Sequence, residues 1–108
     1  MARGVARGDI WLYRFAPPDK RRPVLVLSRP AALAHLRTAV VAPISSKIHG
    51  LPSEVCLGIA EGMKGECAVN LDHVYTVQQS DLRTWVARLD AQRMRAVCEA
   101  LNVALGCT

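Results

Sequence analysis

Short apolar runs and apolar–polar alternation fill the first ninety residues, and this pattern predicts a β-sheet. Residues 9–15 alternate apolar and polar side chains, as a half-buried strand does. Residues 23–28 and 38–44 are almost continuously aliphatic, which is typical of strands in the centre of a sheet. Shorter strands are expected at residues 53–57, 66–72, 73–77 and 85–89, with a bend or bulge between the second and third of these.

The segments between these strands carry turn residues. Pro17, Pro18 and Asp19 must form a turn or loop, because paired prolines cannot continue a hydrogen-bonded ladder. Residues 31–37 fit either a short helix or a long connection, and residues 58–65 are expected to form a loop. One helical turn is predicted at residues 79–83.

A helix is predicted over residues 91–105, where the apolar period changes to that of an α-helix. Asp90 is placed to cap its N-terminus, and Gly106 stands where a left-handed residue ends a helix. The predicted apolar stripe consists of Met94, Val97, Cys98, Leu101 and Leu105. Strands first and a helix last predict an α+β, mainly β fold, in which a twisted antiparallel sheet is rolled over a C-terminal helix.

Composition limits the possible functions. The 108 residues suit one domain spanning 1–108, and a hydrophobic content of 51% can supply its core. Lys and Arg number 14 against 9 acidic residues, so the net charge of +5 favours an anionic partner: nucleic acid, an acidic protein or an anionic membrane face. Aromatic residues make up 5%, too few for a broad base-stacking platform.

Targeting and metal-binding signals are missing from the sequence. No apolar run approaches the roughly 18 residues of a membrane span, and no signal-peptide pattern opens the chain, so a cytoplasmic protein with no membrane association is expected. The four cysteines form no C-x-x-C pair and have no histidine at zinc-ligand spacing. We therefore expect reduced thiols, no metal site and no cofactor.

Two groups of polar residues flank the aliphatic runs. Lys20, Arg21 and Arg22 precede residues 23–28, where an arginine can hold a phosphate through two parallel hydrogen bonds. A solvated loop that protects a sheet edge explains the same residues. The second group, Ser45, Ser46 and Lys47, follows residues 38–44; a serine hydroxyl there can donate to a phosphate oxygen or simply form a polar turn.

Asp72 and His73 form a third polar group at the end of a predicted strand. The carboxylate could orient a base or an arginine, and the imidazole could exchange protons near neutral pH. A histidine in such a place is more often structural than catalytic. A serine triad built from Ser45 with these two residues lacks the G-x-S-x-G turn that would support it.

The order of these motifs along the chain resembles the MazF/PemK group of toxin endoribonucleases. The resemblance covers nearly the whole chain and rests on Gly8-Asp9-Ile10-Trp11, Arg22-Pro23-Val24-Leu25-Val26-Leu27-Ser28, Val41-Ala42-Pro43-Ile44-Ser45-Ser46, Pro52-Ser53-Glu54-Val55, Asn70-Leu71-Asp72-His73-Val74, Thr76-Val77, Leu89 and Ala104-Leu105-Gly106. It implies an SH3-like or plasmid-toxin barrel. It also implies a homodimer that binds single-stranded RNA at its interface, and an acidic antitoxin that covers the RNA groove.

The resemblance also assigns roles to individual residues. Arg22 matches the catalytic arginine of the family, and Ser45 matches a hydroxyl residue that is usually threonine. The implied reaction is metal-independent attack of an RNA 2′-hydroxyl on its own phosphate, which leaves a 2′,3′-cyclic phosphate and a 5′-hydroxyl. Residues expected to contact RNA beside these two are Lys20, Arg21, Ser46, Lys47, Asp72 and His73.

Three features depart from the family pattern. Ser45 lacks the methyl group of the usual threonine, the loop of residues 16–21 is shorter, and Tyr75 stands where many relatives carry arginine. Two alternatives keep the fold but not the chemistry: a toxin that poisons gyrase by binding it, or an inactive domain that binds RNA or an acidic peptide. The first depends on an exposed tryptophan that ends the C-terminal helix, whereas Trp11 and Trp85 here both lie in predicted strands.

Overall fold

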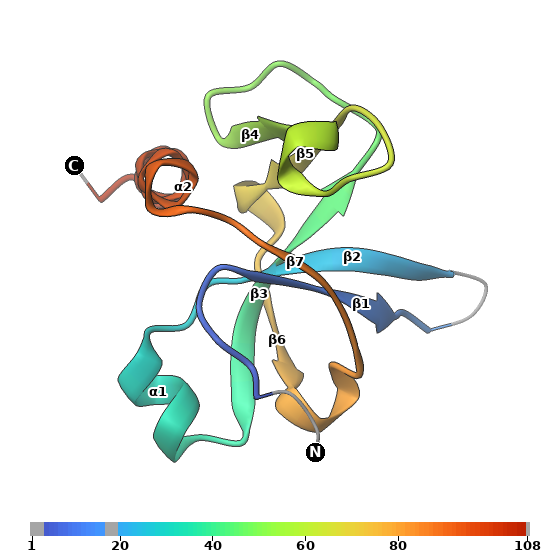
Figure 1. The fold of residues 1–108 in the computed structure, drawn as a ribbon. Coiled ribbons are helices and arrows are strands. Elements are labelled where there is room, and N and C mark those ends of the chain that lie inside the picture. The colour runs from blue at the N-terminus through green and yellow to red at the C-terminus, as the bar shows by residue number, and fades with distance from the viewer. Residues whose placement is uncertain (1–3, 17–19, 108) are drawn as a thin grey trace.

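A computed structural model, which describes residues 4–16 and 20–107, shows a strongly curled antiparallel sheet with helices packed against it (Figure 1). The strands are β1 (Asp9–Arg14), β2 (Arg21–Val26), β3 (Thr38–Ser45), β4 (Glu54–Leu57), β5 (Cys67–Asn70), β6 (Tyr75–Gln78) and β7 (Thr84–Arg88). The helices are α1 (Pro30–His35) and α2 (Ala91–Leu105), and three 3-10 turns are η1 (Ile59–Glu61), η2 (Leu71–His73) and η3 (Gln79–Asp81). The mainly β class with a C-terminal helix is confirmed.

Strand β3 is shared by the two halves of the sheet. Along one path the strand order is β4-β5-β3-β2-β1-β7, and β6 pairs with β3 off this path. Residues Thr38–Val41 of β3 pair with β6, whereas Ile44 and Ser45 pair with β5. Pro43 lies between these two stretches, where the absence of its N–H costs no ladder bond to either strand. The bend of β3 therefore separates the two ends of the sheet, as Figure 1 shows.

The alternation of side chains along β2 and β3 produces two buried clusters, one on each face. Leu25 and Ala42 belong to the cluster that α2 covers with Val97 and Ala100. Val24 belongs to the other cluster, together with Val26, Val41 and Trp11 and, at its margin, Leu33 of α1. Both faces of these central strands are thus buried, which explains why residues 23–28 and 38–44 are aliphatic rather than alternating.

Several predicted strand boundaries need correction. The strand expected at residues 73–77 begins at Tyr75, because His73 lies in the turn η2. Strand β2 begins at Arg21 and ends at Val26, so Arg21 and Arg22 lie within the strand instead of preceding it. The strand expected at residues 66–72 ends at Asn70, because the Asn70 side chain accepts a hydrogen bond from the Asp72 N–H (2.9 Å) and starts the turn η2. The turn expected at Pro17–Asp19 falls outside the described residues.

The C-terminal helix is confirmed with both of its caps. An Asp90 carboxylate oxygen accepts a hydrogen bond from the Arg93 N–H (2.8 Å), and Gly106 adopts a left-handed conformation with φ 66°. Leu105 was wrongly placed on the apolar stripe, since 59% of it is exposed. Ala100 and Ala104, one turn apart, contact the core instead, because small side chains let the helix approach the sheet.

Asp9 is a fully buried carboxylate that joins the first strand to the last. One oxygen accepts hydrogen bonds from the Ala6 N–H (2.8 Å) and the Trp11 indole (3.2 Å). The other accepts from the Trp85 indole (3.3 Å) and from Arg88 Nε (2.8 Å). Burial raises the pKa of Asp9, but these four donors outweigh it and leave the pKa below its usual value. The carboxylate is therefore held ionised where β1 meets β7.

Candidate functional site

A groove of about 740 Å³ opens where β2 and β3 diverge. The last pair of residues joined across these strands is Val24 with Pro43. Beyond that pair, residues 21–23 of β2 form one wall of the groove, and Ile44, Ser45 and Ser46 form the opposite wall. Leu12 of β1 and Val86 of β7 also line it.

Arg22 and Ser45 lie on the two facing walls. The pairing of β2 with β3 ends at Val24 and Pro43, and Arg22 and Ser45 each lie two residues beyond that pair along their own strand, where both line the groove. Side chains alternate between the two faces of a strand, so Arg22 lies on the same face as Val24 in β2, and Ser45 on the same face as Val41 in β3. Val24 and Val41 belong to one buried cluster, so Arg22 and Ser45 share that face of the sheet. The two residues expected to be catalytic are thus brought to one site from two separate strands.

The side chains of this pair are available to a ligand. Arg22 is exposed, and its guanidinium forms no hydrogen bond to another described residue. The Ser45 hydroxyl oxygen accepts a hydrogen bond from the Lys47 N–H (3.1 Å), which fixes the oxygen and leaves the hydroxyl proton to be donated. The polar-turn interpretation of this serine is therefore correct as well, and it does not compete with a role in binding.

The loop between β4 and β5 closes the end of the groove. Gly62, Met63, Lys64, Gly65 and Glu66 all line it. Gly62 has φ 89°, and a Cβ atom there would lie 2.9 Å from the Cβ of Ala87, so only glycine lets this loop rest directly on β7. Sequence reasoning identified a loop here but not its place at the site; its turn glycines gave no indication of what it packs against.

The charges around the groove favour an anion. Arg21, Arg22 and Lys64 contribute three cationic groups, and Glu66 is the carboxylate among the lining residues. The walls themselves include apolar carbon from Leu12, Pro23 and Ile44, so a ligand with both phosphate and base or sugar surfaces fits the lining.

Four of the residues expected to bind RNA do not line this groove. Lys20 and Lys47 lie just outside it, next along the chain to lining residues. Asp72 accepts a hydrogen bond from the buried Ser53 hydroxyl (2.5 Å), and His73 ends the turn η2. The structure thus gives Asp72 a local role in joining η2 to the start of β4, whereas Arg21 and Ser46 do lie in the groove as expected.

Glu54 organises the chain that leads away from Ser45, a role that sequence reasoning missed. Its carboxylate accepts hydrogen bonds from the N–H groups of Leu51 (3.0 Å) and His49 (3.1 Å). These bonds, with that of Leu51 foremost, hold the pKa of Glu54 below its usual value. These bonds therefore fix the conformation of the connection from β3 to β4.

Metal-binding clusters and membrane-spanning helices are absent from the part of the chain that the structure describes. Within residues 4–16 and 20–107, no three His, Cys, Asp or Glu side chains gather closely enough to hold a metal ion. No helix in the same two ranges is long and apolar enough to cross a membrane.

Comparison with known proteins gave consistent matches over almost the whole chain. Residues 6–105 match the family described as PemK-like, MazF-like toxin of type II toxin-antitoxin system. The chain is 46% identical to the probable endoribonuclease MazF5 of Mycobacterium tuberculosis over 104 residues, which cover 95% of this chain and 94% of that protein.

Solved structures agree with the sequence matches. The fold superposes on the Mycobacterium tuberculosis toxin MazF-mt6 with a TM-score of 0.82 and 32% identity, covering 91% of this chain and 96% of that one. It also resembles a chain of the MazE-MazF crystal structure from Deinococcus radiodurans, with a TM-score of 0.81 and 27% identity, covering 98% and 99% of the two chains.

Proposed function

Since the chain belongs to the PemK-like, MazF-like family of toxins from type II toxin-antitoxin systems, we propose that it is an endoribonuclease that cuts single-stranded RNA in the groove between β2 and β3. The observation that carries this proposal is the placement of Arg22 and Ser45 on facing walls of a basic groove. A single-stranded backbone is thin and flexible enough to enter such a groove with its phosphate between the two residues.

The proposed reaction is a transesterification at one phosphate. The 2′-oxygen of a ribose bonds to the adjacent phosphorus, and the bond from that phosphorus to the 5′-oxygen of the next nucleotide breaks. The proton of the 2′-hydroxyl passes to water in the open groove, and the leaving 5′-oxygen takes up a proton from water, so that no proton is gained or lost overall. Negative charge grows on the phosphate oxygens during this exchange, and the products are a 2′,3′-cyclic phosphate and a 5′-hydroxyl.

Arg22 supplies the charge that this transition state needs. A guanidinium stays protonated at all physiological pH values and offers two parallel donors to phosphate oxygens. Its place on a sheet strand fixes the backbone from which it reaches, so little reorganisation accompanies the reaction. Ser45 would donate its hydroxyl proton to the same phosphate or orient the attacking 2′-hydroxyl from the opposite wall.

The proposal extends to the partners of the protein. The solved MazE-MazF complexes of the relatives support an antitoxin for this chain, and its net charge of +5 makes an acidic one complementary. We further infer a homodimer and a cytoplasmic location. The gyrase-poison alternative lacks its required residue, because Trp11 lies buried in β1 and Trp85 lies in β7, away from the end of α2.

Cleavage in the presence of EDTA tests the proposed chemistry. Purified protein is expected to cut several long, unstructured transcripts with excess EDTA present, because Arg22 provides the positive charge at the phosphate. The new 5′ ends should accept labelled phosphate from polynucleotide kinase without phosphatase treatment. Intact transcripts under all conditions, or activity that returns only with added divalent metal, would contradict the proposed reaction.

The hydroxyl at position 45 allows a second test. A Ser45→Ala variant is expected to lose about 10–100-fold in kcat/KM, the usual range for a hydrogen bond to a charged group. Ser45→Thr should retain or exceed wild-type activity, because the β-branched side chain suits a strand and restricts the direction of its hydroxyl. Initial rates on one transcript give both values.

Ser46→Ala is the matched control for this test, since Ser46 lines the same wall one residue away. A loss below about threefold is expected, because Ser46 lies beyond the end of β3 and its hydroxyl is not held by a strand backbone. If Ser46→Ala were as harmful as Ser45→Ala, the hydroxyl at position 45 would have no special role.

A further inference from the structure

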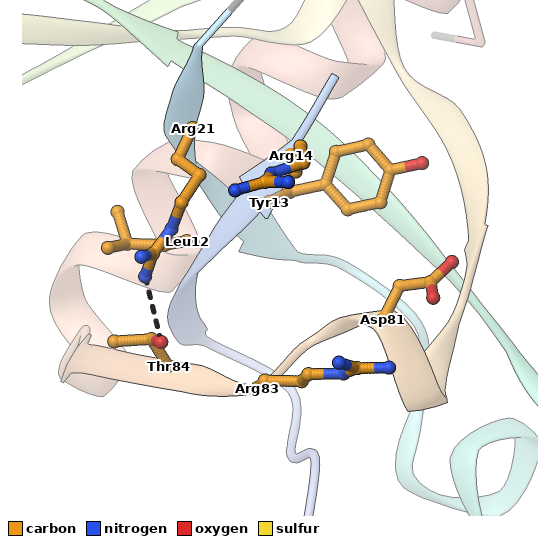
Figure 2. Close-up of a pocket in the computed structure, with 7 residues that line it drawn as sticks. All are labelled: Leu12, Tyr13, Arg14, Arg21, Asp81, Arg83 and Thr84. Carbon is orange, nitrogen blue, oxygen red and sulfur yellow. Dashed lines mark hydrogen bonds between the residues drawn. The ribbon is translucent and has the colours of Figure 1, made fainter. Parts of the chain in front are cut away.

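A second hollow of about 500 Å³ adjoins the groove, and three of its seven lining residues are arginines. Arg14, Arg21 and Arg83 surround it, with Tyr13, Thr84 and Asp81 completing the polar lining (Figure 2). These residues come from three separate segments: the end of β1, the start of β2 and the entry to β7. Three arginines and one carboxylate leave the hollow with a clear positive charge.

Two of these arginines face each other across paired strands. Arg14 and Arg21 are directly opposite in the β1/β2 register. Like charges in that position repel and destabilise the pair, so their presence calls for a compensating anion. No ion pair between a carboxylate and either of them forms within the described part of the chain.

The existing hydrogen bonds leave most guanidinium donors free. Arg21 Nη2 donates to the Thr84 hydroxyl (2.9 Å), and Arg83 Nε donates to the Ser80 carbonyl oxygen (3.3 Å). These bonds orient the two guanidiniums and use one donor of each. In Figure 2, the Arg14 guanidinium lies above the open space and that of Arg83 lies below it.

The hollow is continuous with the groove of the proposed reaction. Leu12 and Arg21 line both spaces, so Arg21 stands at the boundary between them. Arg21 and Arg22 point to opposite faces of β2, so a polyanion that places one phosphate beside Arg22 passes over the edge of the strand to reach Arg21 and, beyond it, Arg14 and Arg83. This continuity favours the RNA itself, rather than a separate ligand, as the occupant.

We propose that Arg14, Arg21 and Arg83 form a second phosphate-binding site, which holds the RNA backbone at a nucleotide away from the cleaved bond. This inference rests on the proposed function, because the path begins at the Arg22 phosphate. The site contributes to binding and register, not to the chemical step. Asp81 lowers the affinity of the site for phosphate, because its carboxylate places a negative charge beside the bound phosphate.

Binding and cleavage by an Arg14→Ala/Arg83→Ala double variant test this site. The binding probe is a random-sequence, single-stranded 20-nucleotide pool in which every ribose is 2′-deoxy, so it keeps the phosphates and cannot be cut. Its Kd is expected to rise about tenfold at low salt. The slope of log Kd on log salt should fall by about 0.7 for each phosphate that the variant no longer neutralises. Cleavage of RNA should show a raised KM with kcat within about twofold of wild type.

Two further variants separate local binding from general charge. Arg37→Ala/Arg95→Ala removes two exposed arginines that line neither space, and its Kd should change less than about twofold. Asp81→Asn should tighten binding about two- to threefold, because it removes the opposing carboxylate. A purely structural role for the arginines would not produce this opposite response.

Each outcome decides between the alternatives. Equal weakening in the two double variants would overturn the site, and so would loss of affinity for polyglutamate without loss for the nucleotide pool, which would indicate an acidic protein partner. A lowered kcat with unchanged KM would overturn it too. If wild-type protein cut no RNA while the pool responded as expected, the phosphate site would stand and the proposed reaction would fall.

Discussion

An Arg22→Ala variant is expected to cut RNA with a kcat about 10²–10³-fold below that of the wild-type protein. This is the usual loss when one preorganised donor to a developing negative charge is removed. The Arg22 side chain is exposed, and its guanidinium makes no hydrogen bond to another described residue, so its loss should leave the free energy of unfolding almost unchanged. Single-turnover rates at saturating enzyme, with urea unfolding in parallel, measure both quantities.

Arg22→Lys is the informative control for this variant. Lysine keeps the charge but offers a point donor instead of two parallel ones, so its rate should fall between those of arginine and alanine. Arg95→Ala, on the outer side of α2, should cut at the wild-type rate. If Arg22→Ala cut RNA as fast as Arg95→Ala does, the proposed site would be wrong.

The second large effect is a loss of folding stability when the buried carboxylate of Asp9 is removed. An Asp9→Ala variant is expected to lose about 2–4 kcal/mol of unfolding free energy, because buried donors left without an acceptor cost about 1–3 kcal/mol each, whereas Arg88 is half exposed and regains water. Its four donors would lose their acceptor, and the Trp11 indole N–H would stay buried without one. Urea unfolding, followed by tryptophan fluorescence and circular dichroism, gives the value. Asp81→Ala, an exposed carboxylate without an ion pair to another described residue, should change it by less than about 0.5 kcal/mol.

The pH dependence of Asp9 follows from its lowered pKa. The folded protein binds the Asp9 proton more weakly than the unfolded chain does, so the stabilisation is complete above the unfolded pKa of about 3.9. It disappears as the pH falls through the folded value. An Asp9→Asn variant should therefore lose less stability than the wild type between pH 5 and pH 3. Parallel acid sensitivity of the two proteins would contradict this role for the carboxylate.

Sequence alone predicted correctly the elements whose ends are set by capping residues close by in the chain. The helix α2 was predicted with both ends correct, because Asp90 and Gly106 act on neighbouring backbone groups. The start of β2 was not, since Arg21 and Arg22 have no strand signal of their own and join the sheet only because Tyr13 and Arg14 lie opposite them. The prediction for Leu105 was wrong for a similar reason: its place in the helix period follows from the sequence, but whether a partner covers it depends on the rest of the fold, which leaves it 59% exposed.

The site could be predicted only in part for the same physical reason. Arg22 and Ser45 are recognisable because each flanks an aliphatic run of the sequence within a familiar motif order. Arg14 and Arg83 are solvated charges in the sequence, and only the pairing of β1 with β2 and β7 brings them together. Asp9 gave no sign of its burial, because its donors come from residues up to 79 positions away.

The pairing of β1 with β7 also determines when, during synthesis of the chain, the groove can form. The ribosome synthesises β1 well before β7. At about 5–20 residues per second, roughly 4–15 s separate the addition of Arg14 from that of Thr84. Leu12 and Val86, which line the groove from these two strands, cannot meet before then. A growing chain thus has no complete groove until β7 has been made.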